Sequence, residues 1–418
     1  MLNEEKIRLM TGIAMFEKKM MKESIPANRY FKSDYVVVSA GQIDRLGAEM
    51  RAFDTNQKAL IITDTEVAER YLDPAKASLK QVGYQVSVIT VPAGESAKSV
   101  ECASEIWHAM VECGLNRDSV VVALGGGVVG DLAGFTGSTF MRGLRIVQVP
   151  TTLLSMVDSS VGGKTAINLE SGKNLVGTFC QPSLVCADVA TLATLPEREW
   201  ACGCGEIAKS AVIDSEDFFF WLYSHTDQLA AREPETVKEA VQRCIVFKAS
   251  VVARDQEETK GVRECLNYGH TLAHAIETEA GYGVYSHGHA VAQGMRFASR
   301  LAVAHLGASM EFVQTQDALL DALGLPELRL KAEPERLLHL MKGDKKVRSG
   351  KLRFVLPRAC GEWEVCELED EFVLEYLQAW QQQTSLRQSS GNPCATQSYE
   401  QRQQGHGLVR HRKHAQSP

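Results

Sequence analysis

The chain has 418 residues, of which 44% are hydrophobic and 23% are charged, the balance of a soluble globular protein with room for two ordinary domains. Its formal net charge of −7 argues against a general nucleic-acid binder, and it has no run of about 18 apolar residues, so no membrane-spanning helix is expected. The eleven cysteines form no CxxC pair, which favours reduced thiols in a cytoplasmic protein.

The first part of the chain predicts an α/β domain. Residues 1–30 have short apolar runs broken by charge, which indicates an N-terminal extension rather than a secretory signal. Across residues 31–195, β-branched runs such as KALIITD (58–64) and SVVVALGGG (119–127) alternate with stretches of helical periodicity such as 65–83. This alternation predicts a Rossmann-like parallel sheet that is covered by helices on both faces.

The second part of the chain, residues 196–380, predicts mostly helices with a possible late hairpin at 351–368. Its long stretches of helical periodicity are at 217–258, 270–280, 289–307 and 310–323. Residues 381–418 are rich in Gln and Ser and nearly free of large apolar side chains, so we expect a disordered tail. The expected fold class is therefore an N-terminal α/β domain plus a mostly α-helical C-terminal domain.

A glycine motif follows one of the predicted strands. Gly125, Gly127 and Gly130 fit the pattern G-x-G-x-x-G, in which the backbone approaches a pyrophosphate at a helix N-terminus. The acidic residue that usually follows about 20 positions later is absent, and Asp64, at the end of an earlier strand, is a candidate for its role. The motif alone also fits a tight strand–helix turn, and Asp64 alone also fits a helix N-cap region.

Two lysines that each follow a glycine lie in the stretch SSVGGKTAINLESGKN (159–174). A Walker A loop requires G-x4-G-K-[S/T], but Asp158 occupies the first glycine position before Lys164, and Ile167 occupies it before Lys173. Neither lysine therefore belongs to a Walker A loop, and both need another anionic partner.

Four histidines lie within a short segment of the second part. His270 and His274 are at i, i+4 on one helical face, and His287 and His289 follow, which suggests a divalent metal such as Zn²⁺. Thr271 stands where an HExxH motif has its Glu. Spacing alone nominates His270 and His274 as joint ligands, although a single His is more often structural.

Glu206 and Lys209 lie three residues apart in the run GCGEIAKSAV (203–212). An ordinary surface ion pair is one interpretation, worth a few tenths of a kcal/mol. Their apolar surroundings in the sequence weaken that interpretation.

Taken together, these stretches resemble the 3-dehydroquinate synthase family of the sugar-phosphate cyclase superfamily, over roughly residues 35–370. The motifs that carry the resemblance occur in the family's order. They are PAGESAK, GGGVVGDLAGF, MRG, VPTTLLSMVDSSVGGKTAINLESGKNLVG, GEIAKS, RECLNYGHTLAHAIE, HGHAVAQGM and GDKKVRSGKLRFVLP.

The resemblance implies a phosphorus–oxygen lyase that uses NAD and a Zn²⁺ or Co²⁺ ion. The implied reaction converts 3-deoxy-D-arabino-heptulosonate 7-phosphate to 3-dehydroquinate and phosphate, the second step of the shikimate pathway to chorismate and aromatic amino acids. The hydride returns to the substrate, so NAD is recycled. The resemblance also implies a homodimer that binds a small sugar-acid phosphate. The net charge and the lack of a long apolar run predict neither nucleic acid nor membrane as a partner.

The resemblance also implies roles for individual residues. The implied metal ligands are Glu206, His270 and His287, which makes His274 a substrate or proton-transfer residue instead. The implied substrate and catalytic residues are Arg142, Lys164, Lys173, Asn174, Lys209, Lys248, Arg263, Asn267, His274 and Lys346. The implied NAD contacts are Asp64, Glu95, Ser96, Lys98, Gly127, Val128, Val129, Gly130, Asp131, Thr151, Thr152, Lys164, Lys173, Thr191, Leu192, Ala193 and Thr194.

Two positions depart from the family pattern: His289 stands where Glu is usual, and Ala93 replaces a commonly polar residue. One alternative is a sister cyclase of the 2-deoxy-scyllo-inosose or valiolone type, but Arg263 and Asn267 together with the histidines favour dehydroquinate synthase. A second alternative is a metal-dependent NAD polyol dehydrogenase, which would lack the paired-lysine segment and release NADH. The third is an inactive regulatory module, against which the intact polar set argues.

Overall fold

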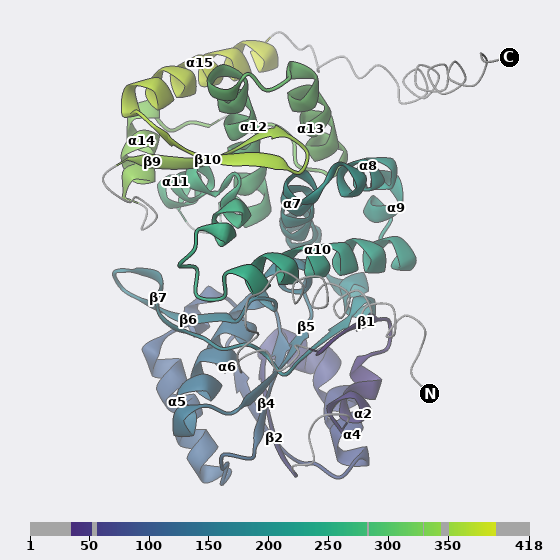
Figure 1. Ribbon diagram of the computed structural model, residues 1–418. Helices are drawn as coiled ribbons and strands as arrows, with labels where there is room; N and C mark the ends of the chain where they lie inside the picture. Colours follow the sequence, from purple (N-terminus) through teal and green to yellow (C-terminus); the bar gives the residue numbers. More distant parts are fainter. Residues whose placement is uncertain (1–34, 52–56, 282–283, 329, 344–350, 390–418) are drawn as a thin grey trace, which may run out of the picture.

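The structure, a computed structural model, describes residues 35–51, 57–281, 284–328, 330–343 and 351–389. The predicted N-terminal extension, Lys346 and residues 390–418 of the predicted tail lie outside the described residues. A half that contains the main sheet and a mostly helical half are stacked on each other (Figure 1). Within the described residues, no helix is long and apolar enough to cross a bilayer.

A six-stranded parallel sheet forms the centre of the first half. Its strand order is β1-β8-β5-β4-β2-β3, and all neighbouring pairs are parallel. β4 is buried along its whole length, as expected for a strand that is covered on both faces. The strands are β1 (Tyr35–Ser39), β2 (Lys58–Asp64), β3 (Gln85–Val91), β4 (Val120–Gly125), β5 (Arg145–Pro150) and β8 (Leu184–Asp188). The predicted parallel sheet is confirmed.

Helices cover both faces of this sheet. Leu60 and Ile61 are consecutive on β2 and point to opposite faces: Ile61 packs in a core with Leu79 of α4, and Leu60 packs in another with Ile106 of α5 and Leu132 of α6. The longer helices are α2 (Leu46–Arg51), α4 (Asp73–Gln81), α5 (Val100–Glu112) and α6 (Gly127–Thr139). The short segments are η1 (Ile43–Arg45), α3 (Thr65–Val67), η2 (Ala68–Leu72), η3 (Glu95–Ala97), η4 (Phe140–Arg142), η5 (Ser155–Ser159) and η6 (Val189–Thr194).

A separate two-stranded hairpin contains the lysine-rich stretch. β6 (Lys164–Leu169) and β7 (Gly172–Phe179) are antiparallel, and they lie at the junction between the two halves (Figure 1). β6 packs closely on α6 because Gly134 has no side chain: a Cβ there would lie 2.3 Å from Thr165 Cγ2. The sequence pattern does not predict this hairpin, because β7 is largely exposed.

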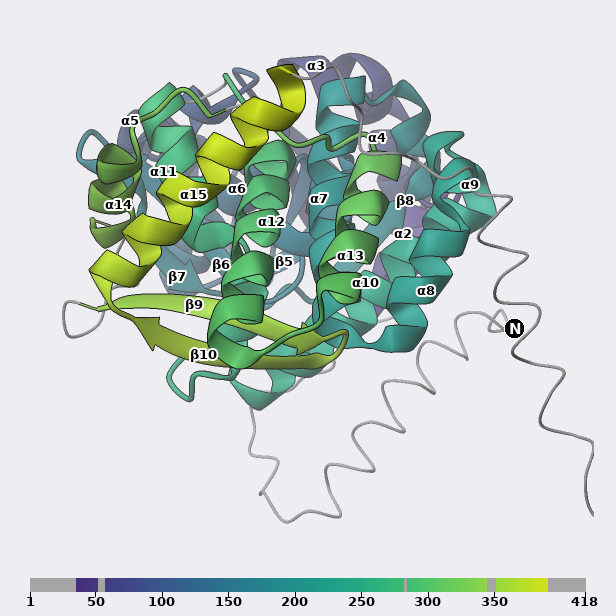
Figure 2. The same cartoon turned by 90° about the horizontal axis from the view of Figure 1, so that it is seen from above.

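The second half is mostly helical, as predicted, and the late hairpin is present. Figure 2 looks down on this half, where α11 and α7 flank α12. Its elements are α7 (Glu197–Asp214), α8 (Glu216–Ser224), α9 (Thr226–Ala230), α10 (Pro234–Arg254), η7 (Val262–Asn267), α11 (His270–Ala280), α12 (His287–Leu306), α13 (Met310–Ala322), α14 (Pro334–Lys342), β9 (Leu352–Ala359), β10 (Glu362–Leu368) and α15 (Asp370–Ser389).

The two halves share one apolar core along an edge of the sheet. Val36 of β1 and Val185 of β8 belong to the same buried cluster as Ile207 of α7 and Val241 of α10. This shared core fixes α7 and α10 next to the segment that follows β5, which brings residues of the two halves to one site.

The last described helix corrects the predicted start of the tail. α15 continues to Ser389, although disorder was predicted from residue 381. Val373, Leu377 and Trp380 are buried and anchor the helix, and the Gln-rich residues that follow are good helix formers that can extend it.

Candidate metal centre and active site

Three predicted metal ligands from three helices meet in the second half. Glu206 lies on α7, and His270 and His287 are the first residues of α11 and α12. One potential ligand atom of each lies within 4.8 Å of those of the others. Nε2 of each imidazole is 3.5 Å from Glu206 Oε1. His274 lies outside this group of three, although the centre of its ring is 5.5 Å from that of His270.

Glycines beside each of these residues allow the helices to meet backbone to backbone. A Cβ on Gly205 would lie 2.7 Å from Gly288 Cα, and a Cβ on Gly294 would lie 1.8 Å from Gly269 O. Such contacts are too short for any side chain, so α7, α11 and α12 approach as closely as their backbones permit. Because Gly205, Gly288 and Gly269 adjoin the three polar residues in sequence, this packing sets the geometry of the cluster.

The outer nitrogens of the two imidazoles have acceptors that orient the rings. His287 Nδ1 is 3.3 and 3.4 Å from the two carboxylate oxygens of Glu277, and His270 Nδ1 is 3.1 Å from Tyr268 O. An acceptor at Nδ1 favours the tautomer whose Nε2 is free to bind a metal. Both rings therefore direct Nε2 toward the Glu206 carboxylate.

The Glu206 carboxylate is suited to a cation. Glu206 is 1% exposed. Within the described part of the chain neither carboxylate oxygen meets the criteria for a hydrogen bond, but Oε2 forms an ion pair with Lys209. Burial alone would raise the pKa of Glu206, but Lys209 and His287 outweigh it and lower the pKa to about 2. Two imidazoles and an ionised carboxylate form a ligand set that fits Zn²⁺ or Co²⁺.

A chain of charges links this cluster to the first half. Lys248 Nζ on α10 donates to Asp158 O and to Asp158 Oδ1, each at 2.7 Å, and Lys209 Nζ is 3.9 Å from the same Oδ1. Burial would raise the pKa of Asp158, but Lys248 and Lys209 lower it, and burial would lower the pKa of Lys209, but Glu206 and Asp158 raise it. The four groups alternate in sign as Glu206, Lys209, Asp158 and Lys248.

Sequence reasoning gave Asp158 no role and noted it only as a mismatch to the Walker pattern. The usable signal was its place as the only carboxylate between the predicted threonine pair at 151–152 and the first lysine, Lys164. A charged residue after the apolar run LLSMV needs a partner, and its partners come from helices far away in sequence.

Arg263 adds a third cation beside the two lysines. Its Nη1 donates to Gln256 O at 2.9 Å, and a Cβ on Gly162 would lie 3.1 Å from its Nη2 and 3.6 Å from Lys248 Cε. Gly162 also has φ +102°, a conformation that favours glycine. Positive charge therefore converges at the segment after η5, as recognition of a phosphate or carboxylate requires.

The glycine motif forms the turn between β4 and α6. Gly126 is the N-cap of α6 and provides no side-chain cap, so the first N–H groups of the helix remain available to an anion. A Cβ on Gly127 would lie 3.0 Å from Ser159 Oγ, and a Cβ on Gly130 would lie 2.9 Å from Gln148 Oε1. Both interpretations of the motif are therefore compatible with the turn.

Lys98 connects the loop after β3 to this turn and to the lysine hairpin. Its side chain is 4% exposed, and its Nζ donates to Asp131 Oδ2 and to Asn174 Oδ1, each at 2.6 Å. Lys173 Nζ lies 3.8 Å from Glu95 Oε1. The predicted NAD residues and the predicted substrate residues of the hairpin are thus in direct contact.

The rest of the predicted NAD set lies at the ends of strands and on short helices. Asp64 caps α3 by accepting from Glu66 N–H and Val67 N–H at 3.0 and 2.9 Å. Val129 and Leu192 are buried in apolar cores and can offer only backbone groups to a ligand. The remaining members are Ser96 on η3, Val128 on α6, Thr151 and Thr152 after β5, and Thr191, Ala193 and Thr194 on η6.

The other predicted substrate residues have differing positions. Lys164 begins β6 and forms an ion pair with Glu258, Asn267 ends η7, and His274 lies on α11. Arg142 stands apart at the end of η4 with φ +71°, and among the described residues no contact joins it to either cluster.

The two departures from the family pattern lie outside the metal ligand set. His289 Nδ1 is 2.7 Å from Oγ of Ser286, the N-cap of α12, so it occupies the position of the Glu in a capping box. Ala93 is half-buried in the loop before η3.

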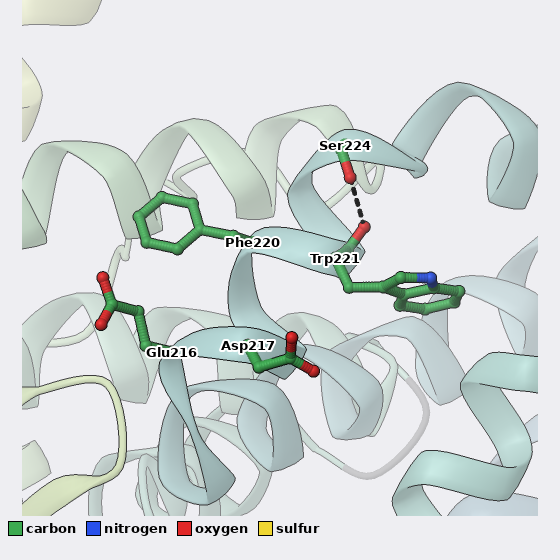
Figure 3. A pocket seen from close by; sticks show the side chains of 5 residues that line it. All are labelled: Glu216, Asp217, Phe220, Trp221 and Ser224. Carbon is green, nitrogen blue, oxygen red and sulfur yellow. Dashed lines mark hydrogen bonds between the residues drawn. The ribbon is translucent and has the colours of Figure 1, made fainter. Parts of the chain in front are cut away.

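A surface hollow on α8 is distinct from these clusters. It is lined by Glu216, Asp217, Phe220, Trp221 and Ser224, none of which belongs to a predicted set (Figure 3). Two of these side chains already have a partner: Arg243 Nη1 is 2.8 Å from Asp217 Oδ2, and its guanidinium lies 4.8 Å from the centre of the Trp221 ring.

The chain is similar to known proteins in both sequence and fold. Family models of 3-dehydroquinate synthase match residues 88–202 (N-terminal) and 203–347 (C-terminal). The 3-dehydroquinate synthase of Rhodopirellula baltica is 50% identical over 302 residues, which are 72% of this chain and 80% of the relative. A 2-deoxy-scyllo-inosose synthase structure complexed with carbaglucose-6-phosphate, NAD⁺ and Co²⁺ is 26% identical with a TM-score of 0.76, covering 82% of this chain and 96% of that one.

A 2-epi-5-epi-valiolone synthase from Streptomyces hygroscopicus subsp. jinggangensis, solved with NAD⁺ and Zn²⁺ bound, is 27% identical with a TM-score of 0.76. That match covers 86% of this chain and 99% of the other. With both family models and a half-identical curated relative in agreement, the chain belongs to the 3-dehydroquinate synthase family.

Proposed function

We propose that this chain converts 3-deoxy-D-arabino-heptulosonate 7-phosphate to 3-dehydroquinate and phosphate, with NAD recycled during each turnover. The main support is that a possible metal-binding cluster lies beside a group of buried cations. The cluster consists of Glu206, His270 and His287. Lys209 and Lys248, which form the group of cations, both contact Asp158. A polyhydroxylated substrate with a carboxylate and a phosphate requires both a metal centre and several cations. This reaction is the second step of the shikimate pathway.

Glu206, His270 and His287 would hold the divalent metal, Zn²⁺ or Co²⁺. When bound, the metal supplies Lewis acidity that lowers the pKa of the substrate hydroxyl to be oxidised. Lys209 stays protonated because its pKa is raised by Glu206 and Asp158 against the effect of burial, so it can donate to a substrate oxygen beside the metal. His274, one turn after His270, is our candidate for moving a proton.

The hairpin and the neighbouring cations would bind the acidic groups of the substrate. Lys164, Lys173, Asn174, Lys248 and Arg263 form the core of this set, because each is joined by contacts to Asp158, Gly162 or the Lys98 loop or lies on the same hairpin. Arg142, Asn267 and Lys346 complete the proposed substrate set.

The cofactor would lie at the carboxyl ends of β2, β4 and β5. The pyrophosphate of NAD would bind the N–H groups that begin α6 at Gly127 to Asp131, and Asp64 would bind the ribose. The remaining proposed contacts are Glu95, Ser96, Lys98, Thr151, Thr152 and Thr191 to Thr194, together with Lys164 and Lys173 of the hairpin. NAD and a divalent metal in the two related solved cyclases support this assignment.

The proposal extends to the environment of the enzyme. We propose a cytoplasmic homodimer, organised as an α/β domain over residues 31–195 and a helical domain over 196–380, that does not bind nucleic acid. Light scattering of the purified chain tests the dimer, and a monomer mass would exclude it.

Two alternative functions, a sister cyclase and a polyol dehydrogenase, predict different results in an assay with the heptulosonate phosphate and NAD. A sister cyclase would leave the heptulosonate phosphate unchanged, and a polyol dehydrogenase would accumulate NADH in solution. The 50% identity to a dehydroquinate synthase, against 26% and 27% to the two other cyclases, favours the proposed substrate.

The test incubates the purified chain with the heptulosonate phosphate, NAD and Zn²⁺. Phosphate and dehydroquinate should appear in equal amounts, without net NADH. Lys173→Ala should lose turnover while remaining folded, whereas Lys80→Ala, which removes an exposed lysine of α4, should not. Phosphate release without dehydroquinate, or stoichiometric NADH, would exclude the proposal.

A further inference from the structure

Asn168 is the residue at which the lysine hairpin meets the loop that carries Glu95 and Lys98. Its backbone N–H donates to Lys98 O at 2.8 Å. Its Nδ2 donates to Glu95 Oε1 at 2.9 Å, and its Oδ1 accepts from the backbone N–H of Asn174 at 2.9 Å. Asn168 belongs to neither the proposed NAD set nor the proposed substrate set, yet it bonds to both.

The partners of Asn168 determine which way its amide points. A backbone N–H can only donate, so the Asn174 amide requires the oxygen, and an ionised Glu95 can only accept, so it requires the NH₂ group. The side chain is therefore an adaptor between a donor on the hairpin and an acceptor on the loop. A residue of similar shape but different hydrogen-bonding pattern would satisfy only one side.

The bond to Asn174 holds that residue in an uncommon conformation. Asn174 has φ +54°, in the left-handed region that Asn tolerates better than most residues. In this conformation its Oδ1 accepts from Lys98 Nζ, which also donates to Asp131 Oδ2 at the start of α6. Loss of the Asn168 bond would remove a contact that fixes the backbone of Asn174.

We propose that Asn168 is a positioning residue that couples the cofactor loop to the substrate end of the hairpin. Through Asn168, the arrangement of Glu95 and Lys98 and the left-handed conformation of Asn174 form together. This inference rests on the proposed function for the identity of the two ligands. It requires that NAD and substrate strengthen each other's binding by the same factor, because coupling between sites is reciprocal.

Two single substitutions of Asn168 test its hydrogen bonds to Glu95 and to Asn174. Asn168→Ala removes both side-chain bonds and should lower kcat/KM for the heptulosonate phosphate by roughly tenfold, mainly through KM. Asn168→Asp keeps an acceptor for Asn174 but places a carboxylate against Glu95, so it should lower kcat/KM as well. A merely structural residue would instead reduce the yield of folded protein and leave KM unchanged.

A compensating substitution provides the decisive measurement. In the double variant Asn168→Asp with Glu95→Gln, the new amide can donate to the new carboxylate, so the bond between hairpin and loop is restored with donor and acceptor exchanged. In the Glu95→Gln background, Asn168→Asp should therefore have little further effect on kcat/KM. The kcat/KM of the double variant should be at least roughly threefold higher than the value obtained by multiplying the two single effects. Purely multiplicative effects would overturn the proposal.

Hydrogen exchange tests the same contact without any turnover. The Asn174 amide should exchange more rapidly in Asn168→Ala than in the unaltered chain, whereas Ser171→Ala, in the exposed turn of the hairpin, should change neither exchange nor kinetics. If the chain makes no dehydroquinate but exchange follows this pattern, the proposed function fails and the positioning role stands. Unchanged exchange and kinetics in Asn168→Ala would reject the positioning role while the proposed function stands.

Discussion

The glycine turn of the sheet half and the metal cluster of the helical half present chemistry in opposite ways. At Gly126 to Gly130 the groups available to a ligand are backbone N–H groups, and the glycines keep side chains away. At Glu206 and Lys209 the groups are ionised side chains that are almost fully buried, and glycines only allow the helices to approach. A site built from backbone is vulnerable to added atoms, and a site built from buried charges is vulnerable to lost ones.

The largest expected effect comes from removing the central carboxylate. Glu206→Gln should abolish tight metal binding and lower activity by more than about 100-fold, beyond the effect expected for a residue that only orients a ligand. It should also destabilise the fold by about 3 kcal/mol, because the buried Lys209 loses its nearest opposite charge. Metal titration by calorimetry and urea unfolding would measure both effects.

Glu199→Gln is the matched control, since it neutralises an exposed carboxylate on the same helix. Wild-type metal affinity in Glu206→Gln would show that the cluster is not the metal site.

The next largest effects are expected from two Gly→Ala substitutions, which add one methyl group to each region. Gly288→Ala should separate α12 from α7, because a Cβ there would lie 2.5 Å from Cys202 O, at a cost of about 1–3 kcal/mol. A Cβ on Gly127 would lie 3.0 Å from Ser159 Oγ, so Gly127→Ala should fold with a smaller loss of stability.

Each of these two variants should weaken the binding of a different ligand. Gly288→Ala should weaken metal binding and leave NAD affinity unchanged, and Gly127→Ala should do the reverse. Separate titrations with Co²⁺ and NAD provide the measurement. If either variant weakens the binding of Co²⁺ and of NAD equally, the two regions do not act independently.

A smaller effect is expected from the carboxylate that orients His287. Glu277→Gln removes the charge next to His287 Nδ1 and should weaken metal affinity by roughly 10–100-fold without unfolding the chain. Glu279→Gln, two residues further along α11 in an ion pair with Arg336, should have little effect on the metal. The absorption spectrum of the Co²⁺ form would report any change in coordination, and an unchanged metal affinity would contradict the orienting role.

The smallest expected effect is a pH dependence of stability. Asp158 has a folded pKa below its unfolded value near 3.8, so its stabilisation is present above that value and is lost as the pH falls through the folded pKa. Asp158→Asn should therefore lower the unfolding midpoint at pH 7, and its difference from the wild type should shrink only as the pH falls below 3.8. Thermal unfolding across this range tests the sign, and parallel curves would show that Asp158 does not contribute.

The fold was predictable where one face or both faces of an element are apolar. β4 and the other central strands are continuous β-branched runs, and the long helices show clear periodicity, so both halves followed from the sequence. The β6–β7 hairpin did not, because β7 is largely exposed and its lysines drew attention to chemistry instead. The end of α15 was missed because polar helix formers resemble a disordered tail in composition.

The site was predictable only with the help of family resemblance. Spacing on one helix suggested His270 with His274, whereas the second imidazole of the cluster, His287, comes from another helix. Asp158 and Asn168 were missed because their roles depend on partners from distant segments. The glycines at 205, 269, 288 and 294 were missed for the same reason, since each is needed only where two backbones cross.

The apolar core that joins the sheet edge to the helices has a practical consequence for dissecting this enzyme. Val36 and Val185 belong to a buried cluster that includes side chains of α7 and α10 as well as residues of their own half. Residues 35–195 expressed alone would leave that edge uncovered in water and should self-associate. The two halves are therefore best regarded as one cooperative unit that unfolds together, whatever boundary is drawn between them.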